Sequence, residues 1–255
     1  PATGTGTFLT EIVKTIHANF KNQPALWQKY VEDELFPRLN GFEFMMAPYS
    51  IAHIKLDLLL SETGFRHTGN KRLNIYLADS LKAPNDSPIN TNFAYKLSRE
   101  IKKADRIKRN KPIMVMIGNP PYNELRDLEQ DMQVALKSSI YYDDAKGGRL
   151  NMYQFFYPLA ISIAKENGIV SMITQNSILA EDSALGNRKL FFAQTDILSI
   201  DSFPERDNKN LRVFESAKMS VCICTLRRNN HPDICNIIPI NVWHSRYMQD
   251  KHELN

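Results

Sequence analysis

Short apolar runs alternate with amphipathic stretches along most of the chain. Apolar residues recur at helical spacing in several stretches, as Phe8, Ile12, Val13 and Ile16 do near the start. The helices predicted in this way cover about residues 7–20, 25–35, 49–62, 99–111, 151–167 and 187–194. Compact apolar runs bounded by turn residues predict strands at 41–44, 73–79, 112–117, 169–174, 197–203 and 218–226. Helices and strands that alternate in this order predict a parallel, doubly wound α/β fold.

Glycine and proline mark the ends of several of these elements. Gly64 and Gly168 follow predicted helices as C-terminal caps, and Pro37 ends another helix. The stretch 83–92 is rich in turn residues, and 123–150 predicts a helix and a loop without strand periodicity. The last thirty residues carry no pattern that assigns them to an element.

Composition places the chain among globular proteins. Its 255 residues are 43% hydrophobic and 24% charged, which allows one α/β domain or two small ones with a sizeable core. No apolar stretch is long enough to span a membrane and no secretory signal opens the sequence. We therefore expect a cytoplasmic protein with no membrane partner.

The three cysteines indicate neither a disulfide framework nor a clear metal site. Their odd number favours a reducing compartment. Cys222, Cys224, His231 and Cys235 could be written as four zinc ligands. However, the first two alternate with apolar residues in a predicted strand, whereas structural zinc sites space their cysteines on a turn. We expect buried apolar roles for them and no metal.

Positive charge is concentrated in one predicted helix. The whole chain carries a net charge of only +4, but residues 99–111 contain seven positive and two negative side chains. Such a helix could lie along phosphates, and it could equally be a solvated outer face.

The segment Asn119-Pro120-Pro121-Tyr122 directly follows the predicted strand 112–117. Two consecutive prolines cannot continue a sheet ladder, so the strand ends there in a rigid turn. The turn holds two acceptors, an Asn amide and a proline carbonyl, at the edge of the sheet where ligands bind in open α/β folds. This arrangement suits an NH2 group that donates two hydrogen bonds while its ring stacks on the tyrosine. The alternative is an edge turn without catalytic meaning.

A glycine turn, Gly4-Thr5-Gly6, precedes the first predicted helix. It permits close approach of the backbone to a ligand. It lacks the lysine of a phosphate-binding P-loop, and Leu9 replaces the third glycine of a dinucleotide fingerprint. Both absences fit a ligand without phosphates.

Asn119-Pro120-Pro121-Tyr122 resembles the motif of amino-group methyltransferases that use S-adenosylmethionine, above all the N6-adenine DNA methyltransferases. Residues 1–9 are similar to the first motif of that family, although its leading acidic residue and the central strand that carries it would precede Pro1. We therefore expect this chain to be a piece of a longer polypeptide. The resemblance implies an α/β fold with a doubly wound, mostly parallel sheet and a terminal antiparallel strand. It places the catalytic domain at residues 1–230 and the start of a following segment or linker at 231–255.

The resemblance also implies a cofactor site for S-adenosylmethionine. Glu43 would hold the ribose hydroxyls, Asp79 would accept from the adenine amino group, and Phe156 would pack against the adenine. The alternatives are a capping or surface role for the carboxylates and a core role for the aromatic ring. The cofactor-binding residues implied in full are Pro1, Ala2, Thr3, Gly4, Gly6, Phe8, Glu43, Phe44, Asp79, Ser80, Asn119 and Phe156.

The implied reaction is methyl transfer to the amino group of a flipped adenine in double-stranded DNA. The catalytic residues would be Asn119, Pro120, Pro121 and Tyr122, with the Asn119 oxygen and the Pro120 carbonyl accepting the amino protons. A base inside a duplex cannot reach such a site unless it is flipped out. Tyr122 would stack on one of its faces and Phe214, in a late motif, on the other. A buried loop anchor is the alternative role for Phe214.

Residues 1–9, 44–53 and 117–122 look most like the methylase portion of single-chain restriction-modification enzymes fused to a helicase. Duplex DNA and further domains of the same polypeptide, for target recognition and for a helicase or nuclease, are therefore the expected partners. Methyltransferases of protein glutamine amides or RNA bases share the tetrapeptide and remain the alternative. A non-catalytic module that only binds DNA or a partner is a second alternative, against which the intact tetrapeptide speaks.

Overall fold

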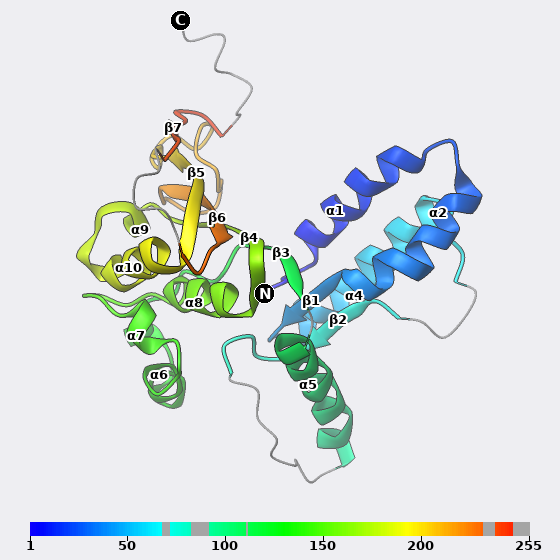
Figure 1. The fold of residues 1–255 in the computed structure, drawn as a ribbon, viewed down its shortest axis with the longest axis horizontal. Helices are drawn as coiled ribbons and strands as arrows, with labels where there is room; N and C mark the ends of the chain where they lie inside the picture. Colours follow the sequence, from blue (N-terminus) through cyan, green and yellow to red (C-terminus); the bar gives the residue numbers. More distant parts are fainter. Residues whose placement is uncertain (68–71, 83–91, 111, 232–237, 247–255) are drawn as a thin grey trace, which may run out of the picture. The chain divides into compact units, whose positions relative to one another are not determined.

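The computed structural model describes residues 1–67, 72–82, 92–110, 112–231 and 238–246 (Figure 1). The chain separates into two compact units, Pro1–Lys111 and Pro112–Asn255. Most of the turn-rich stretch 83–92, Cys235 and much of the segment 231–255 lie outside the described residues. The division into a domain at 1–230 and a following segment stays a prediction.

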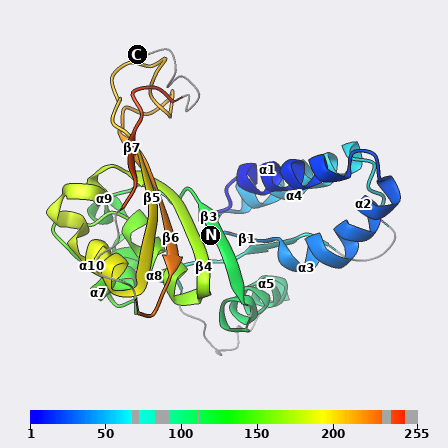
Figure 2. The ribbon, with the colours of Figure 1, turned by 45° about the horizontal axis from the view of Figure 1, so that its top comes forward.

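The first unit is built on two parallel strands, β1 (Asn40–Glu43) and β2 (Asn74–Leu77). Helices α4 (Met46–Glu62) and α5 (Asn92–Asn110) both contact β2 and lie on opposite sides of the strand pair (Figure 2). The remaining helices are α1 (Thr7–His17), η1 (Ala18–Phe20), α2 (Pro24–Tyr30), the π-helical η2 (Val31–Leu35) and α3 (Phe36–Arg38).

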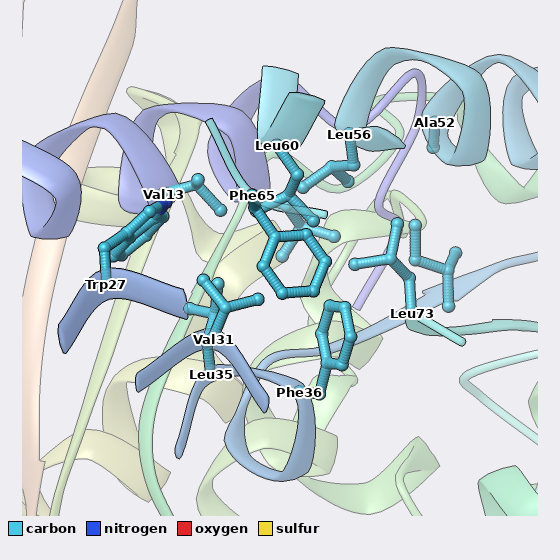
Figure 3. Packing of buried hydrophobic residues seen from close by; sticks show 12 residues of the cluster. Val13, Trp27, Val31, Leu35, Phe36, Ala52, Leu56, Leu60, Phe65 and Leu73 are labelled. Atoms are coloured by element: carbon cyan, nitrogen blue, oxygen red, sulfur yellow. The ribbon is translucent and has the colours of Figure 1, made fainter. Parts of the chain in front are cut away.

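One hydrophobic cluster holds these helices together. Figure 3 shows Phe65 packed among side chains from η2, α3 and α4, and its ring meets that of Phe36 edge to face at 5.5 Å between centroids. Trp27, Leu56 and Leu60 are among the largest fully buried side chains. Some of the apolar positions that predict these helices, such as Val13, therefore fill the core, whereas Phe8 is exposed. The labelled members of the cluster are Val13, Trp27, Val31, Leu35, Phe36, Ala52, Leu56, Leu60, Phe65 and Leu73.

The second unit contains a five-stranded mixed sheet with the strand order β3-β4-β6-β5-β7. Pairing is parallel for β3 with β4 and for β5 with β7, whereas β6 is antiparallel to both of its neighbours. Helices α8 and α10 contact each other and pack against β4 and β5, respectively (Figure 2). The strands are β3 (Ile113–Gly118), β4 (Ala164–Gln175), β5 (Thr195–Phe203), β6 (Val221–Arg228) and β7 (Ile240–Val242). The helices are η3 (Leu125–Asp127), α6 (Gln130–Lys137), α7 (Tyr142–Ala145), α8 (Tyr153–Ile163), α9 (Ser177–Ala180), η4 (Asp182–Ala184) and α10 (Leu185–Gln194).

The predicted fold class is confirmed as α/β with mostly parallel pairing, since three of the five strand pairings described are parallel. The antiparallel strand implied by the resemblance is present as β6. It lies inside the sheet between β4 and β5 and is antiparallel to both. Strand β7 pairs with the outer side of β5, so β6 is not at the edge of the sheet.

One predicted helix end was wrong. The helix before β4 ends at Ile163 rather than at residue 167, and Gly168 is not its cap. The chain already becomes extended at Ala164, and it is Asn167 that takes the left-handed conformation, with φ 65°. Gly168 is needed for close approach, because a Cβ there would lie 2.7 Å from the Lys165 carbonyl oxygen. The helix end predicted near Pro37 is confirmed, since the π-type turn of η2 leads into α3, which contains that proline and ends at Arg38.

The predicted burial of the cysteines is confirmed for the two that are described. Cys222 and Cys224 are buried in β6 as free thiols, with their Sγ atoms 3.9 Å apart. Within the described ranges, no three His, Cys, Asp or Glu side chains gather in a way that could hold a metal ion. The described helices also include none whose length and apolar character would allow it to cross a membrane.

A buried hydrogen bond in the first unit supports a stability prediction. The Trp27 indole N–H donates to Thr63 Oγ1 at 2.9 Å, and the indole is 1% exposed. Thr63→Val keeps the shape but leaves that donor unsatisfied, so we expect a loss of about 1–2 kcal/mol in the free energy of unfolding. Urea denaturation measures it, with Thr15→Val on the exposed side of α1 as the matched control. An equal effect of the two variants would contradict the prediction.

Candidate functional site

The glycine turn at the start of the chain is held against β1. The Thr3 backbone N–H donates to the Phe42 carbonyl oxygen at 2.9 Å, and the Gly6 N–H donates to the Thr3 oxygen at 3.1 Å. Gly4 and Gly6 have φ values of 58° and 82°, in the left-handed region that favours glycine. A Cβ on Gly6 would lie 3.2 Å from the Ala52 Cβ, so glycine also lets α1 approach α4 closely.

Glu43 anchors this turn from the end of β1. Its buried carboxylate accepts the Gly4 N–H at 2.7 Å through one oxygen and the Met45 N–H at 2.9 Å through the other. Each carboxylate oxygen has capacity for a further donor. The structure therefore gives Glu43 a role in shaping the turn, and its contact with a ribose stays a prediction.

A cavity of about 350 Å³ lies where β1 and β2 end, within the first unit. Its volume falls in the range of small-molecule sites. Phe44, which follows β1 and is 61% exposed, forms one part of the wall. The walls consist of Phe44, Leu77, Ala78, Asp79, Lys82, Ile101 and Asp105. Two of the predicted cofactor residues, Phe44 and Asp79, thus meet in one cavity that suits a flat, mostly apolar ring with a polar edge.

Asp79 supplies an acceptor at this cavity. One oxygen of its exposed carboxylate accepts the Leu81 N–H at 2.8 Å, which fixes the side chain and leaves its second oxygen for a ligand donor. Ser80 is buried and, unlike Phe44 and Asp79, it is not part of the cavity wall.

Helix α5 contributes cavity residues that the sequence analysis missed, namely Ile101 and Asp105. A third missed residue is Lys108, whose buried ammonium donates to the Asp79 carbonyl oxygen at 2.9 Å. Ala104, Ile107 and Lys108 share one face of the helix, but this spacing does not reveal that the lysine holds the Asp79 loop. Arg99, Lys102, Lys103 and Arg106 are exposed on the same helix, and contact of these cations with phosphates stays a prediction.

The tetrapeptide lies at the carboxyl end of β3 in the second unit, as predicted. Its backbone is fixed from the start of α8, because Asn151 Nδ2 donates to the Tyr122 carbonyl oxygen at 2.7 Å. The Met152 N–H adds a bond to the Asn123 oxygen at 2.9 Å. Pro120 is buried, and its neighbours Asn119 and Pro121 are half-buried at the surface of the unit. Asn151 is a further residue that the sequence analysis missed.

The Tyr122 hydroxyl lies between two groups. It is 3.0 Å from the Ile173 carbonyl oxygen and also forms a hydrogen bond with the Oδ1 atom of the Asn119 side chain. Burial raises the pKa of Tyr122 well above its usual value, so the hydroxyl keeps its proton. A phenol has a single proton and can donate to only one of the two groups.

The predicted base-stacking rings are neighbours in the second unit. The ring centroids of Tyr122 and Phe214 are 6.2 Å apart with an angle of 53° between the planes, and Tyr153 meets Tyr122 edge to face. Phe214 lies in the loop between β5 and β6, and Arg212 of the same loop is buried. The Arg212 guanidinium donates to the Glu215 carbonyl oxygen and, at 3.3 Å, to that of Arg206. The structure thus brings Asn119, Tyr122 and Phe214 together.

Other predicted residues stand apart from these contacts. Phe156 is 4% exposed in α8, so most of its surface contacts the protein itself. Phe8 is 40% exposed on α1, and Pro1 and Ala2 are half-buried. The roles of all four toward a cofactor remain predictions.

A family model described as Eco57I restriction-modification methylase matches residues 40–209. The matched range includes Glu43, Asp79 and the tetrapeptide, but neither Pro1–Phe8 nor Phe214.

Several solved structures share the fold. The nuclease-deletion mutant of the Type ISP restriction-modification enzyme LlaGI, in complex with a DNA substrate mimic, is 19% identical with a TM-score of 0.74; the match covers 96% of this chain and 22% of that one. The Type ISP enzyme LlaBIII, bound to DNA, is 17% identical with a TM-score of 0.72 and coverages of 95% and 18%. The M protein of the Type I restriction enzyme EcoKI is 13% identical with a TM-score of 0.53 and coverages of 90% and 39%. The chain thus spans about a fifth of the length of the first two proteins.

Proposed function

The chain belongs to the Eco57I restriction-modification methylase family, and from this premise we propose that it methylates the N6 amino group of a flipped adenine in DNA. S-adenosylmethionine would be the methyl donor. The observation that carries the proposal is the tetrapeptide Asn119–Tyr122 at the carboxyl end of β3, with Phe214 beside its tyrosine ring. The alternatives, a protein glutamine amide or an RNA base as acceptor, use the same chemistry.

The residues of the first unit fit S-adenosylmethionine. The cavity offers the exposed Phe44 ring for the adenine and the Asp79 carboxylate for its amino group. Glu43 retains acceptor capacity for ribose hydroxyls beside a glycine turn that presents backbone rather than side chains. The bound cofactor would supply an electrophilic methyl group on a sulfonium.

The acceptors of the tetrapeptide support the transfer step. An amino nitrogen on a heteroaromatic ring is a poor nucleophile because its lone pair is delocalised into the ring. The Asn119 side-chain oxygen and the Pro120 carbonyl oxygen accept hydrogen bonds from the two N–H groups of this amine and favour a tetrahedral nitrogen. They also stabilise the positive charge that develops as the nitrogen–carbon bond forms and the carbon–sulfur bond breaks. The methylated amine then loses one proton to solvent.

The Tyr122 hydroxyl orients the Asn119 amide for this task. In the structure the Asn119 Oδ1 atom lies against the Tyr122 hydroxyl, an orientation that offers the substrate a donor, which an NH2 group cannot use. The O and N atoms of an amide are assigned from its hydrogen bonds, and the single proton of Tyr122 can serve the Ile173 carbonyl oxygen instead. With the amide turned by half a turn, the hydroxyl oxygen accepts from the Asn119 nitrogen, and the Asn119 oxygen is available to the substrate.

The test is methyl transfer by the full-length polypeptide that contains this chain. The protein is incubated with S-adenosylmethionine labelled in its methyl group and with duplex DNA, RNA or a glutamine-rich protein as acceptor. Digestion of the DNA to nucleosides should release the label as N6-methyladenine. Label in cytosine, in RNA or in protein would contradict the proposal, as would no transfer to any acceptor.

A further inference from the structure

Lys108 is an unusual residue to find in the interior of α5. Its side chain is 2% exposed, while the cations around it on the same helix reach solvent. Burying an ammonium is costly unless hydrogen bonds and opposite charges replace its water. An apolar side chain of similar length would fill the same space at lower cost. The presence of a lysine here therefore calls for a reason other than packing.

The groups around the ammonium identify that reason. The Lys108 Nζ donates to the Asp79 carbonyl oxygen at 2.9 Å and to the Lys82 carbonyl oxygen at 3.0 Å. These two bonds span the loop that follows β2. The Asp105 carboxylate, 4.0 Å away on the preceding turn of α5, balances part of the charge.

The same loop forms the wall of the cavity described above. Asp79 and Lys82 both line it, and so does Asp105. Lys108 itself does not line the cavity. A single buried cation thus ties α5 to the loop at two points, at Asp79, whose carboxylate would receive the adenine amino group, and three residues later at Lys82.

We propose that Lys108 is a positioning residue of the cofactor site, which fixes the Asp79 loop so that its carboxylate meets the 6-amino group of the adenine. This inference rests on the proposed use of S-adenosylmethionine. Without the ammonium, the Asp79 and Lys82 carbonyls lose their shared donor, and the loop has several conformations in place of one. The cofactor then has to order the loop when it binds, which weakens binding but leaves the transfer step unchanged once the site is saturated.

The experiment compares Lys108→Met with Lys103→Met, an exposed position on the same helix that loses the same charge. Binding of S-adenosylhomocysteine to the full-length protein is measured by calorimetry, together with binding of the analogue whose purine lacks the 6-amino group. The wild-type protein should prefer the amino compound. Lys108→Met should weaken its binding about tenfold or more and lose most of that preference, since charge-assisted hydrogen bonds of this kind carry effects of that size. Lys103→Met should keep both the affinity and the preference.

Turnover separates positioning from a general structural role. At saturating cofactor, Lys108→Met should transfer methyl groups within about twofold of the wild-type rate, with the change confined to KM. An unchanged affinity and preference in Lys108→Met would overturn the inference alone. So would equal losses for both analogues, or a variant that does not fold, because each would make the lysine a structural requirement. Failure of the wild-type protein to bind S-adenosylhomocysteine would instead overturn the proposed function, and this inference with it.

Discussion

Asn119→Ala is expected to lower the single-turnover rate of methyl transfer by about two to three powers of ten while leaving cofactor affinity nearly unchanged. The size is that of losing one preorganised group that stabilises charge in the transition state. Asn119 follows β3 directly, and its amide is held by the Tyr122 hydroxyl, so its orientation is set before any substrate arrives. Cofactor affinity is expected to depend mainly on Glu43, Phe44 and Asp79.

The measurement is transfer of labelled methyl groups to duplex DNA with enzyme in excess. Asn123→Ala is the matched control, because Asn123 is exposed and the hydrogen bond that it accepts from the Met152 N–H uses only its backbone oxygen. The control should react at close to the wild-type rate. Wild-type turnover by Asn119→Ala would remove the asparagine from the mechanism. A large loss of cofactor affinity would show that it binds the cofactor rather than the target amine.

The order of the elements could be predicted because hydrophobic periodicity and turn residues act locally. Each of the six predicted strands exists, and each short apolar run became a strand in the sheet of its own unit. The end of α8 could not be predicted, because residues 164–167 continue the helical pattern. What ends the helix is pairing of Ala164 with Ile113, a contact between positions far apart in the sequence.

The candidate site could be predicted only where a residue belongs to a motif. Asn119 and Tyr122 are recognisable because two prolines follow a strand, and Asp79 because it follows another strand. The residues that hold them in place have no such signal. Asn151 acts on the Tyr122 carbonyl from 29 residues away, and Lys108 acts on the Asp79 carbonyl from the same distance along the chain. Supporting residues of this kind depend on tertiary contacts, so a single sequence does not reveal them.

The Tyr122–Phe214 pair has a geometry that bears on how a base would enter. A planar ring between two others needs about 7 Å between the outer rings, which is twice an ordinary contact distance. The two rings are 6.2 Å apart and tilted by 53°, so they contact each other rather than frame a slot. We expect an incoming base to turn the rings parallel and move them apart. The Tyr122 side chain is held at its hydroxyl and its backbone is held at its carbonyl oxygen. The bond from Arg212 holds only the backbone of the loop that contains Phe214, so Phe214 is the ring expected to move.

Removal of either ring should therefore weaken capture of the extruded base by about 1–3 kcal/mol, the contribution of one stacked aromatic ring. Fluorescence of 2-aminopurine at the target position reports this step, because its emission rises on unstacking and is quenched by aromatic stacking. Tyr122→Ala and Phe214→Ala should both reduce the quenching. Phe192→Ala, at a ring that is 62% exposed on α10, is the matched control and should not.

Tyr122→Phe divides the two roles given to this residue. The variant keeps the ring and loses the hydroxyl, so quenching of 2-aminopurine should stay at the wild-type level while methyl transfer slows by about tenfold, the cost of one misdirected hydrogen bond. The two Ala variants should also matter less on a substrate whose target adenine is mismatched, since less pairing must be broken before the base flips. Equal losses on matched and mismatched substrates would make the rings structural. Wild-type transfer by Tyr122→Phe would mean that the Asn119 amide finds its orientation without the hydroxyl, and that Tyr122 contributes only its ring.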